Sequence, residues 1–299
     1  MNLIMMKSKL SLKSLARVGL KLFPLIFFLS ACTSSTSPSF LRENISQAVK
    51  DICKKEYKLD LITRLAGQTL WVYMPLKDIL SKSPKPEKYI ERFLMEDKKN
   101  TLSEGILKVS YLIKPVAENE KQQEMTIEKS ANEKIFNVLQ VIRRVLFSID
   151  NTKRDNPMFF CIVTADIKNG FEIKQIFHFL DLKKISYGFI SQTEYQHRII
   201  QDTAVTAQII GDIEGAHLDY QDITLEEFIA YQIQHRIRLK FQKPEVEKNA
   251  DIDKEVLKII VYTLDTYAYK DFTHIEMINL VSGAKTILNQ AAVFAGSKN

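Results

Sequence analysis

The segment Met158–Thr164 reads Met-Phe-Phe-Cys-Ile-Val-Thr and is apolar on both of its alternating faces. A strand with this pattern has other elements packed against both sides, so it belongs in the middle of a sheet. The residues before and after it, at 130–148 and 172–184, have the periodicity of amphipathic helices. A covered strand between two helices restricts the chain to folds that contain both kinds of element.

The rest of the chain also combines short strands with helices. Further strands are expected at 59–65, 69–74, 106–114, 204–210, 275–281 and 285–288. Further helices are expected at 40–56, 224–241 and 252–269, and a loop at Ser83–Pro86. Sequences typical of capping boxes, Ser130–Glu133 and Thr224–Glu227, mark two helix starts. The predicted fold is α+β, with a mixed or antiparallel sheet and helices packed mainly on one face. A boundary near 188–192 suggests two subdomains, residues 40–190 and 191–299.

The first 31 residues have the three zones of a signal peptide. Met1–Lys21 contains five basic residues and no acidic residue, and Leu22–Leu29 is an uncharged apolar run. This run is too short to cross a bilayer, which takes about 20 residues, but it suits the apolar region of a signal peptide. The small residues Ser30 and Ala31 then precede Cys32. An ordinary signal peptide or a signal anchor is the alternative.

The sequence Leu-Ser-Ala-Cys that ends at Cys32 resembles the lipobox of bacterial lipoprotein precursors. In that family the cysteine is acylated, by a diacylglyceryl group and often a third chain such as palmitate, and becomes the N-terminus after cleavage. Two or more acyl chains hold a protein stably on a membrane. The resemblance implies lipidation of Cys32, removal of residues 1–31, and a flexible tether at 32–39. Position 33 is threonine rather than aspartate, which in this family implies the outer membrane, facing the periplasm.

The charge of the chain argues against a nucleic acid partner. The sequence has 42 basic and 36 acidic residues, but five of the basic residues lie in the first 31. Without them, 37 basic residues face 36 acidic ones, a net charge of +1. A protein that binds nucleic acid needs a concentrated positive surface to displace counterions. The basic residues Arg236, Arg238, Lys240 and Lys243 follow acidic residues on one predicted helix, where they complement the helix dipole.

Catalytic and metal-binding motifs are scarce. The sequence lacks Gly-x-Ser-x-Gly, a phosphate-binding glycine loop, His-Glu-x-x-His and Cys-x-x-Cys. Two Glu-x-x-His pairs, Glu194–His197 and Glu214–His217, have the spacing seen in di-metal bundles, but they lack the further glutamates that such a site needs. We therefore expect no metal, no cofactor and no catalytic residue. A carboxylate pair would have to come from five scattered acids: Asp166, Asp212, Glu214, Asp219 and Asp222.

Two aromatic residues, Trp71 and Tyr73, share one face of the strand at 69–74. They either lie in the core under a helix or form an open patch, a candidate interaction surface for a partner. The thiols that remain after lipidation, Cys53 and Cys161, both lie in apolar surroundings. We predict that both are free and buried, since each is explained as a small apolar core residue.

These observations favour a lipid-anchored envelope protein that binds other envelope proteins or helps to assemble a surface structure. One alternative is a periplasmic carrier of a lipid or small apolar ligand, with a hollow lined by Phe136, Phe160 and Phe177. The other is an envelope hydrolase that uses the carboxylates named above. The expected partners are a membrane, through the lipid, and other envelope proteins.

Overall fold

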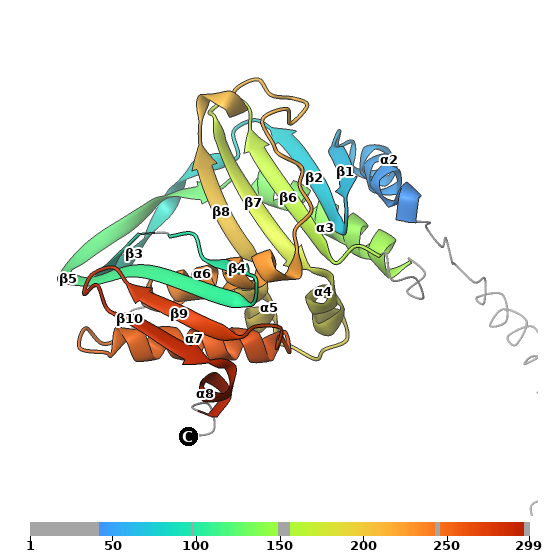
Figure 1. Cartoon of the computed structure of the whole chain (residues 1–299). Coiled ribbons are helices and arrows are strands. Elements are labelled where there is room, and N and C mark those ends of the chain that lie inside the picture. The colour runs from blue at the N-terminus through green and yellow to red at the C-terminus, as the bar shows by residue number, and fades with distance from the viewer. Residues whose placement is uncertain (1–41, 97, 149–155, 243–245, 296–299) are drawn as a thin grey trace, which may run out of the picture. The chain divides into compact units, whose positions relative to one another are not determined.

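The segment predicted as a covered strand lies at the centre of a five-stranded sheet (Figure 1). The computed structural model describes residues 42–96, 98–148, 156–242 and 246–295. All residues of the central strand, β6, are buried, as predicted. The order of the strands is β1 (Ile62–Ala66), β2 (Thr69–Leu76), β6 (Phe159–Asp166), β7 (Phe171–His178), β8 (Ile200–Val205). The sheet is mixed, because β6 is parallel to β2 and antiparallel to β7.

A second mixed sheet is built around one long strand, β5. Its strands are β3 (Leu80–Glu96), β4 (Thr101–Ser103), β5 (Ile106–Ile127), β9 (His274–Asn279) and β10 (Lys285–Asn289). The first part of β5 pairs in parallel with β9, and the rest pairs antiparallel with β3. β5 and β9 lie on either side of the boundary expected near 190, so this pairing joins the two expected subdomains. Phe40–Asn299 accordingly forms one compact unit.

The helices pack on one side of each sheet. They are α2 (Ile45–Tyr57), α3 (Lys129–Phe147), α4 (Phe179–Ser186), α5 (Gln192–Arg198), α6 (Leu225–Gln242), α7 (Ile252–Thr266) and α8 (Gln290–Ala295). α2 and α3 cover the face of the first sheet that carries Leu70, Val72 and Phe160. α6 and α7 cover the face of the second sheet that carries Leu107, Val109 and Ile275. The α+β prediction is therefore confirmed.

The other face of the first sheet is covered mainly by an irregular segment and the start of α6. Trp71, Tyr73 and Cys161 on this face form a cluster with Ile209 and Phe228. From the sequence, a helix was expected to cover a face that carries such residues. An irregular segment serves equally well, because burial requires apolar side chains and satisfied backbone groups rather than a particular secondary structure.

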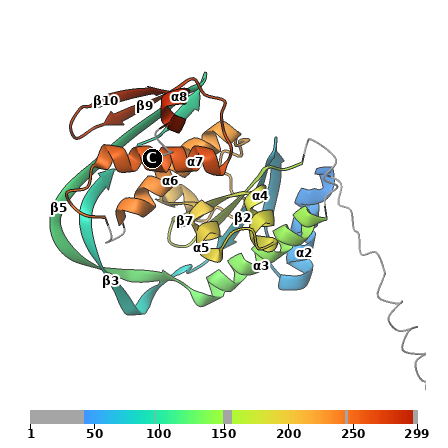
Figure 2. The ribbon, with the colours of Figure 1, turned by 90° about the horizontal axis from the view of Figure 1, so that it is seen from below.

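β3 and β5 form a long two-stranded ribbon that Figure 2 shows curving from the start of α3 towards α6 and α7. The loop predicted at Ser83–Pro86 is wrong, because β3 runs through it. The two prolines, Pro84 and Pro86, have no backbone N–H to donate, and the pairing shifts its register between Lys82 and Glu87. β5 also extends beyond the predicted end at 114. Its second half is mostly polar and has backbone pairing without a buried face, so hydrophobic alternation did not indicate it.

The helix predicted at 172–184 is only partly correct. Residues up to His178 form β7, and the helix α4 begins at Phe179. A turn that ends at Gly170, which has φ +70°, brings the chain back antiparallel to β6. The apolar residues of this segment satisfy both the strand and the helix period, so the neighbouring strand decided between them.

Several other predicted elements are confirmed. The hairpins β1–β2 and β9–β10 form as expected, and so do α2, α3, α6 and α7. The Thr224–Glu227 capping box is present, with Glu227 N donating to Thr224 Oγ1 at 3.2 Å and Thr224 N donating to Glu227 Oε2 at 3.0 Å. The capping box predicted at Ser130 is wrong, since the cap of α3 is Glu128. The strand predicted at 204–210 is largely wrong, because β8 runs from Ile200 to Val205 and a 3-10 turn follows at Ala207–Ile209.

The two thiols within the described residues are free and buried, as predicted. Cys53 packs in the cluster under α2 and α3, and Cys161 packs on the opposite face of the first sheet. The sheet itself therefore separates the two sulfur atoms. Burial raises the pKa of each thiol to about 12, which keeps both protonated and unreactive.

Candidate functional site

Trp71 and Tyr73, the candidate interaction surface of the sequence analysis, are buried and form no open patch. The segment between β8 and α6 lies over them. Trp71 Nε1 donates to the carbonyl of Gln221 at 2.8 Å, and Tyr73 Oη donates to the carbonyl of Asp212 at 2.5 Å. Both aromatic residues are therefore core residues with satisfied polar groups. This corrects the open-patch alternative.

His217 fastens the same segment to the first sheet. Its Nδ1 contacts the Asp212 carboxylate, and its Nε2 lies 2.9 Å from Glu172 Oε2 on β7. Burial disfavours the charged imidazole, but hydrogen bonds to the two carboxylates outweigh burial and raise the pKa of His217. The pKa of Asp212 falls to about 2, since its hydrogen bonds to His217 and to backbone N–H groups outweigh its burial. A protonated His217 between two carboxylates thus holds this segment on β7, and we call this arrangement the His217 clamp.

The Glu-x-x-His pairs do not form the arrangement that their spacing suggested. Glu214 is exposed, and His217 is bound instead by Asp212 and Glu172. Glu194 forms ion pairs with two arginines, as described below. Within the described ranges, no group of three or more histidine, cysteine, aspartate or glutamate side chains is arranged to hold a metal ion.

The scattered carboxylates are separated, and most have structural partners. Asp166 accepts from the backbone N–H groups of Ile79 and two residues of the following turn. Asp222 accepts from Gln68 N at 2.8 Å and from Thr69 Oγ1 at 2.9 Å, which attaches it to the β1–β2 hairpin. Asp219 contacts Gln221.

The residues named for an apolar hollow do not line one together. The rings of Phe160 and Phe177 stack with centroids 4.6 Å apart inside the core, and Phe136 is 59% exposed. Ser282 and Lys285 have the Ser-x-x-Lys spacing of a serine nucleophile, but they fall in the β9–β10 turn and at the start of β10. Lys285 there pairs with Glu276 at 3.1 Å.

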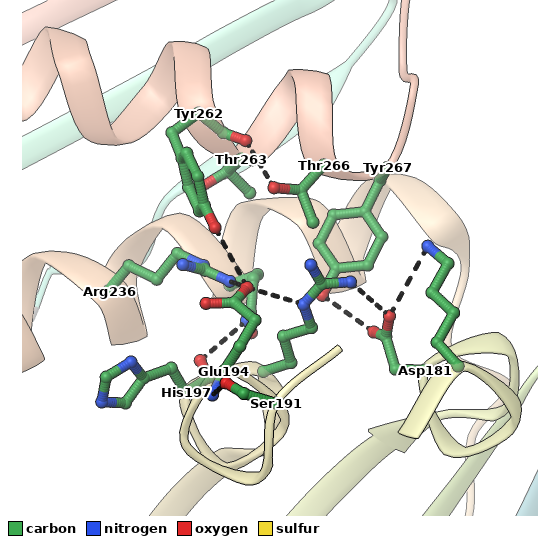
Figure 3. Close-up of polar contacts among 12 residues, drawn as sticks. Asp181, Ser191, Glu194, His197, Arg236, Tyr262, Thr263, Thr266 and Tyr267 are labelled. Carbon is green, nitrogen blue, oxygen red and sulfur yellow. Dashed lines mark hydrogen bonds and ion pairs between the residues drawn. The ribbon is translucent and has the colours of Figure 1, made fainter. Parts of the chain in front are cut away.

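Buried and half-buried charged residues link helices α4 and α5 to α6 and α7 (Figure 3). Arg198, at the end of α5, donates to Asp181 Oδ1 and to Glu194 Oε1, both at 2.7 Å. The same Glu194 oxygen accepts from Arg236 on α6 at 3.2 Å and from Tyr262 on α7 at 3.1 Å. Although burial opposes ionisation, contacts with His178 and Arg198 lower the pKa of Asp181, and contacts with Arg198 and Arg236 lower the pKa of Glu194. We call Asp181, Glu194, Arg198 and Arg236 the charge network.

The basic residues of α6 also have partners. Arg236 belongs to the charge network, and Lys240 Nζ lies 3.4 Å from Glu255 on α7. Lys243 is outside the described residues. These contacts support a role in packing α6 for this part of the basic stretch. Arg198 and Asp181 were not predicted from the sequence. The one local signal for them is the i, i+4 spacing of Glu194 and Arg198, which favours an ion pair on a helix.

A hollow of about 400 Å³ lies between the edge strand β8 and α6. The charge network fixes both of its walls, because Arg198 lies two residues before β8 and Arg236 is part of α6. Gln232 on α6 also donates to the carbonyl of His197 at 3.1 Å. The hollow is lined by basic, acidic and aromatic side chains: Lys99, Lys174, Asp202, Tyr231, His235 and Arg238. We call this space the β8 hollow.

The β8 hollow has an open edge and a basic lining. In the described part of the chain, β8 pairs only with β7, and Gln201–Val205 are all exposed. Lys174 Nζ lies 5.1 Å from the centroid of the Trp71 ring, and Asp202 is opposite Lys174 in the strand register. His235 is buried, and burial together with the charges of Arg238 and Arg236 lowers its pKa to about 4. Its Nδ1 has no hydrogen-bond partner among the described residues.

Comparison with family models, with curated proteins and with solved structures found no match to this chain. The proposed lipidation site, Cys32, lies outside the described residues. Of the helices in the described ranges, none is both long and apolar enough to span a bilayer.

Proposed function

We propose that this chain is a lipoprotein of the bacterial cell envelope, anchored through Cys32 in the outer membrane and facing the periplasm, whose folded part binds another envelope protein. The anchor is supported by the basic and apolar zones before Cys32 and by the lipobox. The binding role is carried by one observation, the β8 hollow beside an open strand edge.

An unpaired strand edge offers a row of backbone N–H and C=O groups to an extended segment of a second protein. A volume of about 400 Å³ is within the range of spaces that accept ligands or short segments. Because the charge network holds β8 and α6 together, the two walls are ordered before a partner arrives. A preformed site loses less conformational entropy on binding than one that must first be ordered.

The lining favours an acidic partner segment. Lys99, Lys174 and Arg238 contribute positive charge, and Asp202 is the carboxylate among the lining residues. His235 is neutral at physiological pH because its pKa is lowered to about 4. We therefore propose that the partner adds an extended segment along β8 and places acidic side chains towards the two lysines.

Photo-crosslinking in intact cells tests the binding role. A benzoylphenylalanine at Asp202, which lines the β8 hollow opposite Lys174, should crosslink to an acidic segment of one envelope protein, identified by mass spectrometry. The Lys99→Glu, Lys174→Gln double variant should lose this adduct. The same probe at the exposed Lys55 on α2 is the matched control and should not give it. An adduct that persists in the double variant, or none at all, contradicts the proposed role of the hollow.

A separate experiment tests the anchor. The Cys32→Ser variant has no thiol to acylate, so it should accumulate as an unprocessed precursor and incorporate no fatty-acid analogue. Equal labelling of the wild type and the variant would overturn the lipoprotein assignment and the localisation together.

A further inference from the structure

Three large apolar side chains are exposed close together where α4 leads into α5. Tyr187 is 69% exposed, Phe189 is 78% exposed and Leu180 is 53% exposed. The rings of Tyr187 and Phe189 have centroids 6.4 Å apart, and Tyr187 also lies 6.3 Å from the ring of Phe147 at the end of α3. Leu180 is seven residues before Tyr187 and so lies on the same face of α4. We call the surface of Leu180, Tyr187 and Phe189 the aromatic patch. Contiguous exposed apolar surface of this kind indicates a binding role.

The aromatic patch is flanked by basic residues. Leu180, Lys183, Lys184 and Tyr187 follow each other at intervals of three, one and three residues, so they share one face of α4. Arg143 on α3 is exposed and lies over the Phe147 ring at 5.7 Å. Asp181 is the one acid between residues 179 and 191, and its buried carboxylate pairs with Arg198 at 2.7 Å and with Lys184 at 3.9 Å, which leaves Arg143 as an exposed cation beside the rings. The outward charge of this face is therefore positive.

Aromatic rings beside lysine and arginine suit the surface of a bilayer. Tyrosine and similar side chains place an apolar ring among the acyl chains and a polar group among the headgroups. Lysine and arginine place their charge at the level of anionic phospholipids while their methylene stems lie on apolar surface. A protein partner would need an apolar surface of matching shape, for which the chain gives no further indication.

The length of the tether permits this contact. Arg42, the first described residue, is ten positions after Cys32. Even a fully extended segment of this length spans only about 35 Å. α2 has 13 residues and is about 20 Å long, and Glu56 at its end bonds to Arg144 of α3 at 2.8 Å, one turn before Phe147. The aromatic patch is thus about one helix length from the point where the tether enters the fold.

We propose that the aromatic patch docks on the bilayer that holds the lipid anchor, with the rings of Tyr187 and Phe189 inserted between phospholipid headgroups. The inference rests on the lipid anchor of the proposed function. It adds a second membrane contact, which orients the folded part against the surface instead of leaving it free on its tether.

The chain contains one tryptophan, the buried Trp71, so an introduced tryptophan reports its own surroundings. The lipidated Phe189→Trp protein is reconstituted into vesicles of phosphatidylethanolamine and phosphatidylglycerol that carry brominated acyl chains. Mass spectrometry first establishes that Cys32 is acylated. The emission of the new tryptophan should then shift to shorter wavelength and be quenched by the bromine atoms, whereas that of Trp71 in the wild-type protein should not change.

Val205→Trp is the matched control, because Val205 at the far end of β8 is 79% exposed. Its tryptophan should stay unquenched. An acylated Phe189→Trp protein that shows no quenching beyond this control overturns the inference and leaves the anchor intact. A blue shift without quenching also overturns it, because the patch is then covered by protein. Absence of acylation instead contradicts the proposed function, which separates the two failures.

Discussion

At the scale of single residues, the segment between β8 and α6 depends on a few exact contacts. His217 lies between two carboxylates, and Trp71 and Tyr73 donate to backbone carbonyls of the segment. Backbone carbonyls that cover a core must be paired, since an unpaired buried polar group is costly. These contacts explain how an irregular segment can cover one face of the first sheet.

The His217 clamp predicts a dependence of stability on pH. Because the pKa of His217 is raised in the folded protein, its stabilisation is complete below the ordinary histidine value and is lost as the pH rises through the folded value. His217→Gln should lower the free energy of unfolding by about 2–3 kcal/mol at low pH, since two carboxylates lose a charged hydrogen-bond donor. The loss should shrink as the pH rises through the raised pKa of His217 in the folded protein. Urea denaturation across this range measures both, with His274→Gln, at a half-buried histidine of β9, as the control.

Gly215 predicts a second effect in the same segment. Its φ is +66°, and an added Cβ would overlap the Tyr220 hydroxyl and lie 2.9 Å from the Tyr73 ring. Gly211 has φ +76° and nothing within 4 Å of such a Cβ. Gly211→Ala should therefore cost only the backbone strain, about 1–2 kcal/mol, and Gly215→Ala clearly more. Thermal unfolding of both variants checks this, and equal losses would contradict the packing explanation.

At the scale of elements, buried ion pairs set the positions of α4, α5, α6 and α7. The charge network is built on Asp181, whose side chain is almost completely buried, and Arg198 is its closest cation. A buried ion pair need not stabilise a fold relative to apolar residues, but the loss of one partner leaves an uncompensated charge. The network is better understood as fixing the geometry of the β8 hollow than as a source of net stability.

Arg198→Met should lower the free energy of unfolding by about 3–5 kcal/mol, because it leaves the buried Asp181 carboxylate without its arginine. Arg144→Met is the matched control. Arg144 also forms a bond of 2.8 Å to a carboxylate, Glu56, but both side chains are at least 40% exposed. That change should cost no more than about 1 kcal/mol. Chemical denaturation of the two variants gives the comparison, and similar losses would show that burial is not the determining factor.

At the scale of the whole molecule, one helix serves two cores. α6 contributes Ile229 and Ile233 to the core of the second sheet and Phe228 to the core on the first sheet. β5 and β9 join distant parts of the chain in the same way. We expect Phe40–Asn299 to unfold as one cooperative unit, since neither sheet keeps its covering elements without the other.

The two thiols test this cooperativity, because they lie in different clusters on opposite faces of the first sheet. Cys53 and Cys161 should be alkylated at the same rate in the native protein, the rate of global unfolding, as both are buried with the pKa raised to about 12. Mass spectrometry after timed alkylation in low denaturant measures the two rates. Early modification of one thiol would show that its face of the sheet opens alone, and a peptide linking the two would contradict the free thiols.

The sequence by itself determined most elements and their buried faces. The alternation in β2, the apolar β6 and the stripe of α6 were readable because local periodicity records which side chains leave water. Only the tertiary structure decided the features that depend on residues far apart in the sequence. Residues up to His178 form β7 because they pair with β6. His217 bonds to Glu172, which is 45 residues away in the sequence. The cover over Trp71 and Tyr73 and the β8 hollow likewise depend on contacts between distant segments, because burial, pairing and charge compensation are properties of the folded surroundings.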